Sequence, residues 1–132
     1  MAILFTCLLN IHAAEAQRID NISEMTVEVD SYENIHVEAL DHHDLSSTFM
    51  IWVKEGVKEH YHKQHTETVY ILEGEGRMKL NDEWQTVSAG DYIFIPKGTR
   101  HAVEVSSTHP MKVISMQSPR FDGKDRVFVS QK

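Results

Sequence analysis

Residues 56–67 read Gly56-Val-Lys-Glu-His60-Tyr-His62-Lys-Gln-His65-Thr-Glu67. Alternate residues of a β-strand face the same side, so a strand here would present the imidazoles of His60 and His62 in one direction. Glu67 follows His62 by an odd number of residues and would face the opposite side of a straight strand. If Glu67 joins the two histidines, we therefore expect a turn or bulge within residues 63–66.

A second segment supplies another imidazole. An apolar strand, a turn and the start of a new strand follow one another in Gly90-Asp-Tyr-Ile-Phe-Ile-Pro96-Lys-Gly98-Thr-Arg-His101, since Pro and Gly at this spacing are typical of a turn. Three imidazoles and one carboxylate form a ligand set suited to one divalent ion of Fe, Mn, Ni, Cu or Zn. The candidate metal ligands are His60, His62, Glu67 and His101.

His65 is an alternative to His62 as a ligand. It shares the strand parity of Glu67, whereas the pair formed by His60 and His62 needs no distortion of the strand. We therefore expect His65 to support the site from its rim. The other histidines singled out, which lie among turn-forming residues and are expected to be exposed, are His42, His43 and His109.

Short apolar or alternating runs continue on both sides of these segments and are separated by turn residues such as Gly74-Glu75-Gly76. No segment after residue 17 sustains a helical period. Roughly nine to ten such strands favour an all-β jelly roll or related closed β structure. The expected strands beside the histidine segment are Met25–Val29, Ile35–Leu40, Thr48–Val53, Thr68–Leu72, Arg77–Leu80, Tyr92–Ile95, Ala102–Val105, Met111–Met116 and Arg126–Val129.

Strand alternation also predicts which side chains line the interior. The expected lining is apolar and contains no Arg or Lys, which suits an apolar or aromatic small molecule. The aromatic residues Trp52, Tyr61, Tyr92 and Phe94 are expected to pack in the core or on the outer face. The predicted lining residues are Met50, Trp52, Val69, Ile71, Met78, Val103 and Val105.

The two segments resemble the two motifs of the cupin family. The spacing of His60, His62, Glu67 and Gly74 matches the first motif, although Gly56 lies closer to the histidines than the family pattern places its leading glycine. The spacing from Gly90 through Pro96 and Gly98 to His101 matches the second motif, whose final position, often Asn, is Val105 here. The resemblance implies a small cupin jelly-roll β-barrel, commonly a homodimer, that holds one divalent metal ion through His60, His62, Glu67 and His101.

We expect the site to act on a small-molecule substrate as a metal-dependent oxidoreductase of dioxygenase type, with an apolar interior around the metal. Glu67 is the candidate catalytic residue, because a carboxylate that leaves a metal ion becomes a base. One alternative is an isomerase, epimerase or lyase that acts on a sugar or small acid. Another is a non-catalytic barrel that binds a small molecule or metal.

Length and composition restrict the remaining classes. The chain of 132 residues carries a net charge of −7, which fits one domain over residues 17–132 and disfavours a nucleic-acid partner. The single cysteine, Cys7, excludes thiolate zinc sites and dithiol redox centres.

The apolar run at residues 2–9, followed by Ala14-Glu15-Ala16, resembles a secretory signal peptide over residues 1–16, although no Lys or Arg precedes it. Removal of this segment would make the protein periplasmic or secreted. The alternative is a buried element in a cytoplasmic protein. A membrane span is not expected, because a span needs about 20 apolar residues and this run is about half as long.

Overall fold

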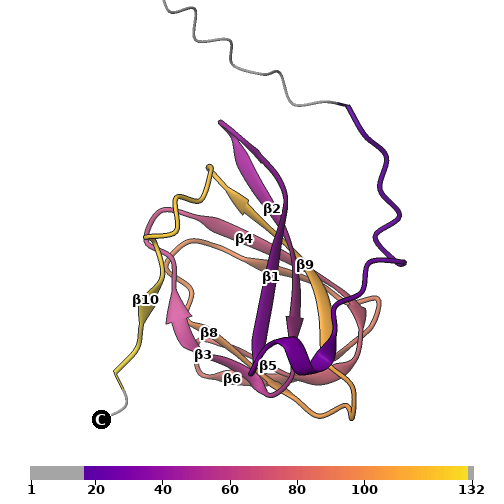
Figure 1. Cartoon of the computed structure of the whole chain (residues 1–132). Coiled ribbons are helices and arrows are strands. Elements are labelled where there is room, and N and C mark those ends of the chain that lie inside the picture. The colour runs from indigo at the N-terminus through magenta and orange to yellow at the C-terminus, as the bar shows by residue number, and fades with distance from the viewer. Residues whose placement is uncertain (1–16, 131–132) are drawn as a thin grey trace, which may run out of the picture.

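The computed structural model describes residues 17–130 and contains two five-stranded antiparallel sheets, which enclose the interior between them (Figure 1). The first sheet is ordered β1 (Ile35–His43), β2 (Ser46–Val53), β9 (Met111–Ser118), β4 (Thr66–Glu73) and β7 (Tyr92–Ile95). The second is ordered β10 (Val127–Phe128), β3 (Gly56–Tyr61), β8 (His101–Val105), β5 (Glu75–Leu80) and β6 (Glu83–Ser88). This arrangement confirms the all-β jelly-roll prediction.

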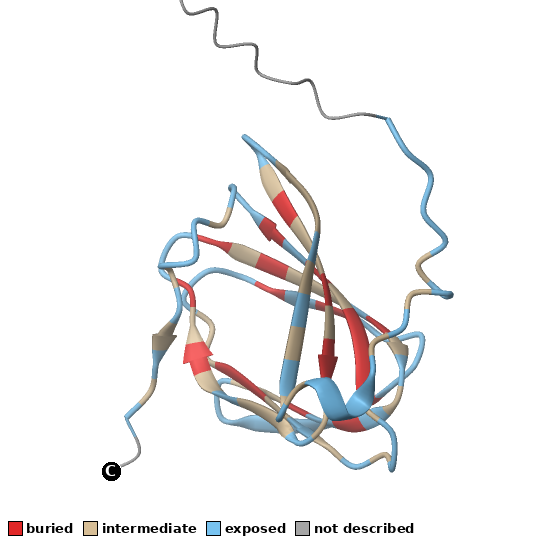
Figure 2. Ribbon diagram, in the orientation of Figure 1, coloured by how far each residue is buried: buried red, intermediate tan, exposed pale blue. Residues whose placement is uncertain are grey.

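The hydrophobic core lies between the two sheets. Figure 2 shows the buried residues as short bands that alternate along the strands with more exposed ones, as expected where only one face of each strand points inward. Both sheets contribute side chains to this core. Its cluster of buried residues consists of Ile71, Met78, Val87, Ile93, Ile95, Met111 and Val113.

The strand predicted at Met25–Val29 is wrong. Residues 17–34 form no strand, and their one regular element is a short 3-10 helix, η1, at Val29–Ser31. The segment instead contacts the first sheet through two lysines, because Lys112 Nζ donates to the Ser23 carbonyl at 3.2 Å and Lys54 Nζ donates to the Tyr32 carbonyl at 2.6 Å.

The structure also differs from the prediction in which face of β2 points inward. Met50 and Trp52 are buried, at 0% and 5% exposure, but they do not line the interior cavity as predicted. Ile51 and Val53 line it instead. Trp52 faces outward with Lys112, which is directly opposite it in β9. Because both faces of β2 are covered, apolar alternation does not identify its inward face.

Three smaller differences concern the ends of strands and exposed edges. The sequence does not predict β6 as a strand. β6 is an edge strand that exposes every side chain except that of Val87, so it lacks the apolar alternation by which the other strands are recognised. His42 and His43 lie within β1 and not in a loop, and His42 is half-buried against Phe49. Tyr92 and Phe94 face outward from β7 and remain exposed.

Within residues 17–130, no helix has the length and apolar character needed to cross a membrane. The predicted signal peptide, residues 1–16, lies outside the described residues.

Candidate metal centre

The four candidate ligands converge from three strands and one turn. His60 lies on β3, His62 follows the end of that strand, His101 opens β8, and Glu67 lies on β4 in the opposite sheet. Their ligand atoms all lie within 4.8 Å of one another, and all four residues are buried. The chain turns between Tyr61 and Thr66, as the parity argument requires. The structure therefore brings together the four residues expected from the sequence.

The turn that carries His101 also supports His62. The Gly98 N–H donates to the His62 carbonyl at 2.6 Å, and the Thr99 N–H donates to the Pro96 carbonyl at 3.1 Å. Gly98 has a φ of +83°, a backbone conformation that glycine adopts without steric cost. The Pro96–Gly98 turn thus ties the two histidine segments together.

Backbone carbonyls orient all three imidazoles in the same way. His60 Nδ1 donates to the Lys58 carbonyl at 2.8 Å, His101 Nδ1 donates to the Thr99 carbonyl at 2.9 Å, and His62 Nδ1 donates to the Asp125 carbonyl. A carbonyl can only accept, so each Nδ1 carries the proton and each Nε2 presents a lone pair. This pattern is typical of histidines that bind metal through Nε2.

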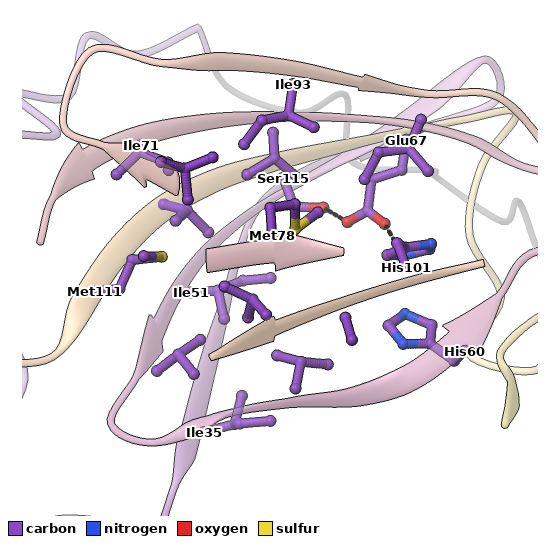
Figure 3. Close-up of a pocket in the computed structure, with 18 of the residues that line it drawn as sticks. Ile35, Ile51, His60, Glu67, Ile71, Met78, Ile93, His101, Met111 and Ser115 are labelled. Atoms are coloured by element: carbon purple, nitrogen blue, oxygen red, sulfur yellow. Dashed lines mark hydrogen bonds and ion pairs between the residues drawn. The ribbon is translucent and has the colours of Figure 1, made fainter. Parts of the chain in front are cut away.

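The chemistry of these atoms fits a cation. Oε2 of Glu67 lies 3.3 Å from His62 Nε2 and 3.2 Å from His101 Nε2, and Figure 3 shows the Glu67 carboxylate directed at the imidazole of His101. His101 Nε2 is buried and has no partner with hydrogen-bond geometry among residues 17–130. A buried acceptor without a donor is costly, and a divalent ion would satisfy these lone pairs together.

The pKa shifts describe an ionised carboxylate beside imidazoles with different environments. Burial alone would raise the pKa of Glu67, but the adjacent imidazoles of His101 and His62 and the hydroxyl of Ser115 hold it well below its usual range. Burial and repulsion from His101 lower the pKa of His60 to about 4, so this ring is neutral at pH 7. Burial lowers the pKa of His62, but the Glu67 carboxylate beside its Nε2 and the Asp125 carbonyl outweigh burial and raise it.

Ser115 was not singled out from the sequence. Its hydroxyl, on β9, donates to Oε1 of Glu67, and the residue is 0% exposed. This bond leaves Oε2 directed at the imidazoles, so Ser115 orients the carboxylate. In the sheet Ser115 is paired with Val69. The sequence therefore does not indicate that Ser115 reaches Glu67 until the register of β4 and β9 is known.

We expect Ser115→Ala to lower the affinity for Zn(II) about 10-fold, because loss of a group that orients a ligand has effects of this order. A competition titration with a chromophoric chelator measures the change. Ser118→Ala, on the same strand but with its hydroxyl bonded to the Leu45 carbonyl, is the control and should bind Zn(II) like the unmodified protein. Equal affinity in both variants would contradict the orienting role.

His65 is engaged away from the cluster, although it is buried. Its Nδ1 lies 2.6 Å from Asp125 Oδ2 and its Nε2 lies 3.0 Å from the Arg120 carbonyl. Both ring nitrogens therefore have partners in the protein, and neither is directed at the cluster of the four candidate ligands. His65 thus takes the supporting place expected for it, as a link to the C-terminal segment.

Asp125 joins that segment to the loop that carries His62. Its carboxylate accepts hydrogen bonds from the backbone N–H groups of Lys63, Gln64 and His65, while its own carbonyl accepts from His62. Burial raises the pKa of Asp125, but hydrogen bonding from His65 and from these N–H groups lowers it to about 2.

We expect Asp125→Asn to destabilise the protein by about 1.5–3 kcal/mol at pH 7, since hydrogen bonds to charged groups contribute this much. The folded pKa lies below the ordinary value of 3.8, so the contribution of Asp125 is complete above about pH 4 and is lost as the pH falls toward 2. Urea unfolding of both proteins across this range measures it. A difference in stability that does not shrink in acid would contradict the role of the charge.

The centre lies at one end of an apolar cavity with a free volume of about 100 Å³. Figure 3 shows the branched and thioether side chains that surround Glu67, His60 and His101. The predicted lining residues Val69, Ile71, Met78 and Val103 are confirmed, whereas Val105 packs against the core and does not line the cavity. The expectation that no Arg or Lys lines the interior is wrong, because Arg126 lines it. Arg126 comes from the C-terminal segment, to which strand parity could not assign a face.

Comparison with known proteins identifies relatives of the chain. A family model described as "Cupin domain" matches residues 47–117. An uncharacterized protein of Aquifex aeolicus is 34% identical over 114 residues, which cover 86% of this chain and 93% of that protein. Quercetin 2,3-dioxygenase of Bacillus subtilis is 33% identical over 76 residues, 54% of this chain but 22% of the enzyme.

Solved structures share the fold. A conserved protein of Klebsiella pneumoniae with a double-stranded β-helix domain superposes with a TM-score of 0.71 at 16% identity, covering 88% of this chain and 100% of that one. The arrangement of the two five-stranded sheets is therefore a known fold.

Proposed function

The chain belongs to the cupin family, and we propose that it is a metal-dependent oxidoreductase of dioxygenase type that acts on a small organic molecule. His60, His62, Glu67 and His101 would hold one divalent ion at the end of the apolar cavity. The similarity of about half the chain to quercetin 2,3-dioxygenase supports this reaction class.

The observation that carries the proposal is the scarcity of acid–base groups around the cavity. Apart from Arg126 and Ser115, every polar side chain that lines it in the described part of the chain belongs to the cluster, and Ser115 is bonded to Glu67. An isomerase, epimerase or lyase needs a further group to move a proton. Chemistry centred on the metal does not, so the lining favours the oxidoreductase.

When bound, a redox-active ion supplies electron exchange between an organic substrate and dioxygen. The protein contributes position and exclusion of water. The apolar lining would hold the substrate in a dry environment, where charge interactions at the centre are strong. The lowered pKa of Glu67 keeps its carboxylate ionised, as a metal ligand requires.

Loading the metal-free protein separately with Fe(II), Mn(II), Ni(II), Cu(II) and Zn(II) tests the proposal. Oxygen uptake is followed with an electrode against a panel of catechols, diketones and thiols. We expect uptake with at least one redox-active ion and none with Zn(II). The absence of uptake with every ion and substrate, together with full metal loading, would contradict it.

Glu67→Gln keeps the size of the side chain and removes its charge. In the same assay this variant should neither retain the metal nor take up oxygen.

The homodimer, the signal peptide and the extent of the domain over residues 17–132 stay predictions. Light scattering and mass spectrometry of the N-terminus of the purified protein test the first two.

A further inference from the structure

One positively charged side chain, Arg126, lines the cavity beside His60, Glu67 and His101. The pairing of β10 with β3 explains its position. Val127 is opposite Tyr61 and Phe128 is opposite His60, so the same register carries Arg126 toward His62. In Figure 1, β10 lies beside β3 at one side of the barrel.

The neighbouring side chains show which face of β10 is directed at the centre. The ring of Phe128 lies with its centroid 5.9 Å from that of His60. Arg126 immediately precedes β10, and alternate residues of an extended chain share a face, so we expect Arg126 on the same side as Phe128. Arg126 is exposed and also lines the cavity, which places it at the mouth of the cavity and not in its depth.

The guanidinium of Arg126 has no ion-pair or hydrogen-bond partner within residues 17–130, whereas Arg18, Arg77 and Arg100 each pair with a carboxylate. The chain carries a net charge of −7, so carboxylates are plentiful elsewhere on its surface. An unpaired guanidinium at the mouth of a cavity is available to a ligand.

The charge of the centre favours an anion. A divalent ion held by three neutral imidazoles and one carboxylate retains a positive charge, and Arg126 adds another at the mouth. Positive charges beside an apolar cavity attract anionic ligands and hold them more strongly than they would in water.

We propose that Arg126 binds the carboxylate of the substrate, which would be a small carboxylic acid whose short apolar chain enters the cavity. This inference rests on the proposed function, because it takes the cavity as the substrate site. It also modifies the apolar or aromatic substrate expected from an interior without Arg or Lys, because it adds a carboxylate.

The donors at the mouth favour a carboxylate over a phosphate. One guanidinium matches a carboxylate with two parallel hydrogen bonds. A phosphate commonly recruits several donors, such as the N–H groups at the start of a helix, and here the lining beyond the cluster, Arg126 and Ser115 is apolar. The free volume of about 100 Å³ is smaller than an engineered cavity of about 150 Å³ that binds benzene, so the apolar chain should be short.

Calorimetric titration of the Zn(II)-loaded protein with isovalerate, a branched carboxylate, tests the inference without any turnover. The neutral probe is 3-methyl-1-butanol, which has the same carbon skeleton, and isobutyl phosphonate tests the other anion. The variants are Arg126→Gln and Arg126→Lys, and the matched control is Lys124→Gln, an exposed lysine of the same segment that does not line the cavity.

We expect Arg126→Gln to weaken isovalerate binding roughly 10- to 100-fold, as loss of a charge-assisted bidentate contact does. Arg126→Lys should have intermediate affinity, and Lys124→Gln should bind like the unmodified protein. The alcohol should bind weakly and equally to all four proteins. Equal affinity of the unmodified protein and Arg126→Gln for isovalerate, no binding of isovalerate, or tighter binding of the phosphonate would overturn the inference.

The same titrations on the metal-free protein separate this inference from the proposed function. Arg126 remains when the metal is removed, so Arg126-dependent binding of isovalerate should persist, with lower affinity. A protein that binds isovalerate through Arg126 but takes up no oxygen with any metal would contradict the oxidoreductase alone. If a carboxylate substrate supports oxygen uptake and Arg126→Gln leaves that uptake unchanged, the result would contradict the role of Arg126 but not the oxidoreductase.

Discussion

His62→Ala is expected to lower the affinity for Zn(II) by at least about 100-fold, because loss of a ligand should exceed the effect of losing a group that orients one. The unmodified protein should gain stability on adding metal, by about 4 kcal/mol at a thousand times the dissociation constant. At the same concentration His62→Ala would be at ten times its own dissociation constant or less, so it should gain about 1.4 kcal/mol or less. Thermal unfolding with and without Zn(II), together with elemental analysis, measures both effects.

Two further variants decide which histidine is the ligand. His65→Gln retains a polar side chain and should lose stability without losing metal, because both nitrogens of His65 are bonded to Asp125 and Arg120. His109→Ala changes an exposed histidine in the turn before β9 and should change neither property. Loss of metal in His65→Gln, with retention in His62→Ala, would reverse the assignment.

Gly76→Ala is expected to destabilise the protein by about 3 kcal/mol, at the upper end of typical overpacking effects. A Cβ at Gly76 would overlap the Glu104 carbonyl oxygen and lie 3.2 Å from Cε of Met111. The backbone of β8 cannot move away without breaking its pairing with β3 on the other side. Urea unfolding monitored by tryptophan fluorescence measures the loss.

Glu75→Ala is the matched control, because it places the same residue on the same strand at an exposed position. It should change stability by about 0.5 kcal/mol or less, as is usual for such surface sites. If Gly76→Ala were equally mild, β5 and β8 would have to separate more easily than their packing indicates. Comparing the Zn(II) affinity of the two variants shows whether the strain reaches His101.

The glycines show what sequence reasoning could and could not find. Gly74-Glu75-Gly76 reads as a turn, and Gly74 indeed has a φ of +90°. Gly76, however, lies within β5, where the close approach of β8 requires it. Turn chemistry is local and visible in the sequence, whereas the distance between two paired backbones depends on both strands.

Alternation succeeded in the segment that carries His60, His62 and Glu67. It predicted that His60 and His62 share a face, and the odd spacing to Glu67 predicted the turn between the sheets. It failed in β2, where Met50 and Trp52 are buried although they do not line the cavity. Such a strand is apolar on both sides, so its pattern is compatible with either orientation.

By itself, the sequence determined the all-β class and the two cupin motifs that contain the four converging residues, because strand alternation, turn residues and motif spacing are local features. The tertiary structure alone decided which groups surround them. Ser115 reaches Glu67 across 48 residues and Asp125 reaches His62 across 63, while Arg126 comes to the cavity with the pairing of β10 and β3. Contacts between distant segments depend on sheet order and register, which no local period records.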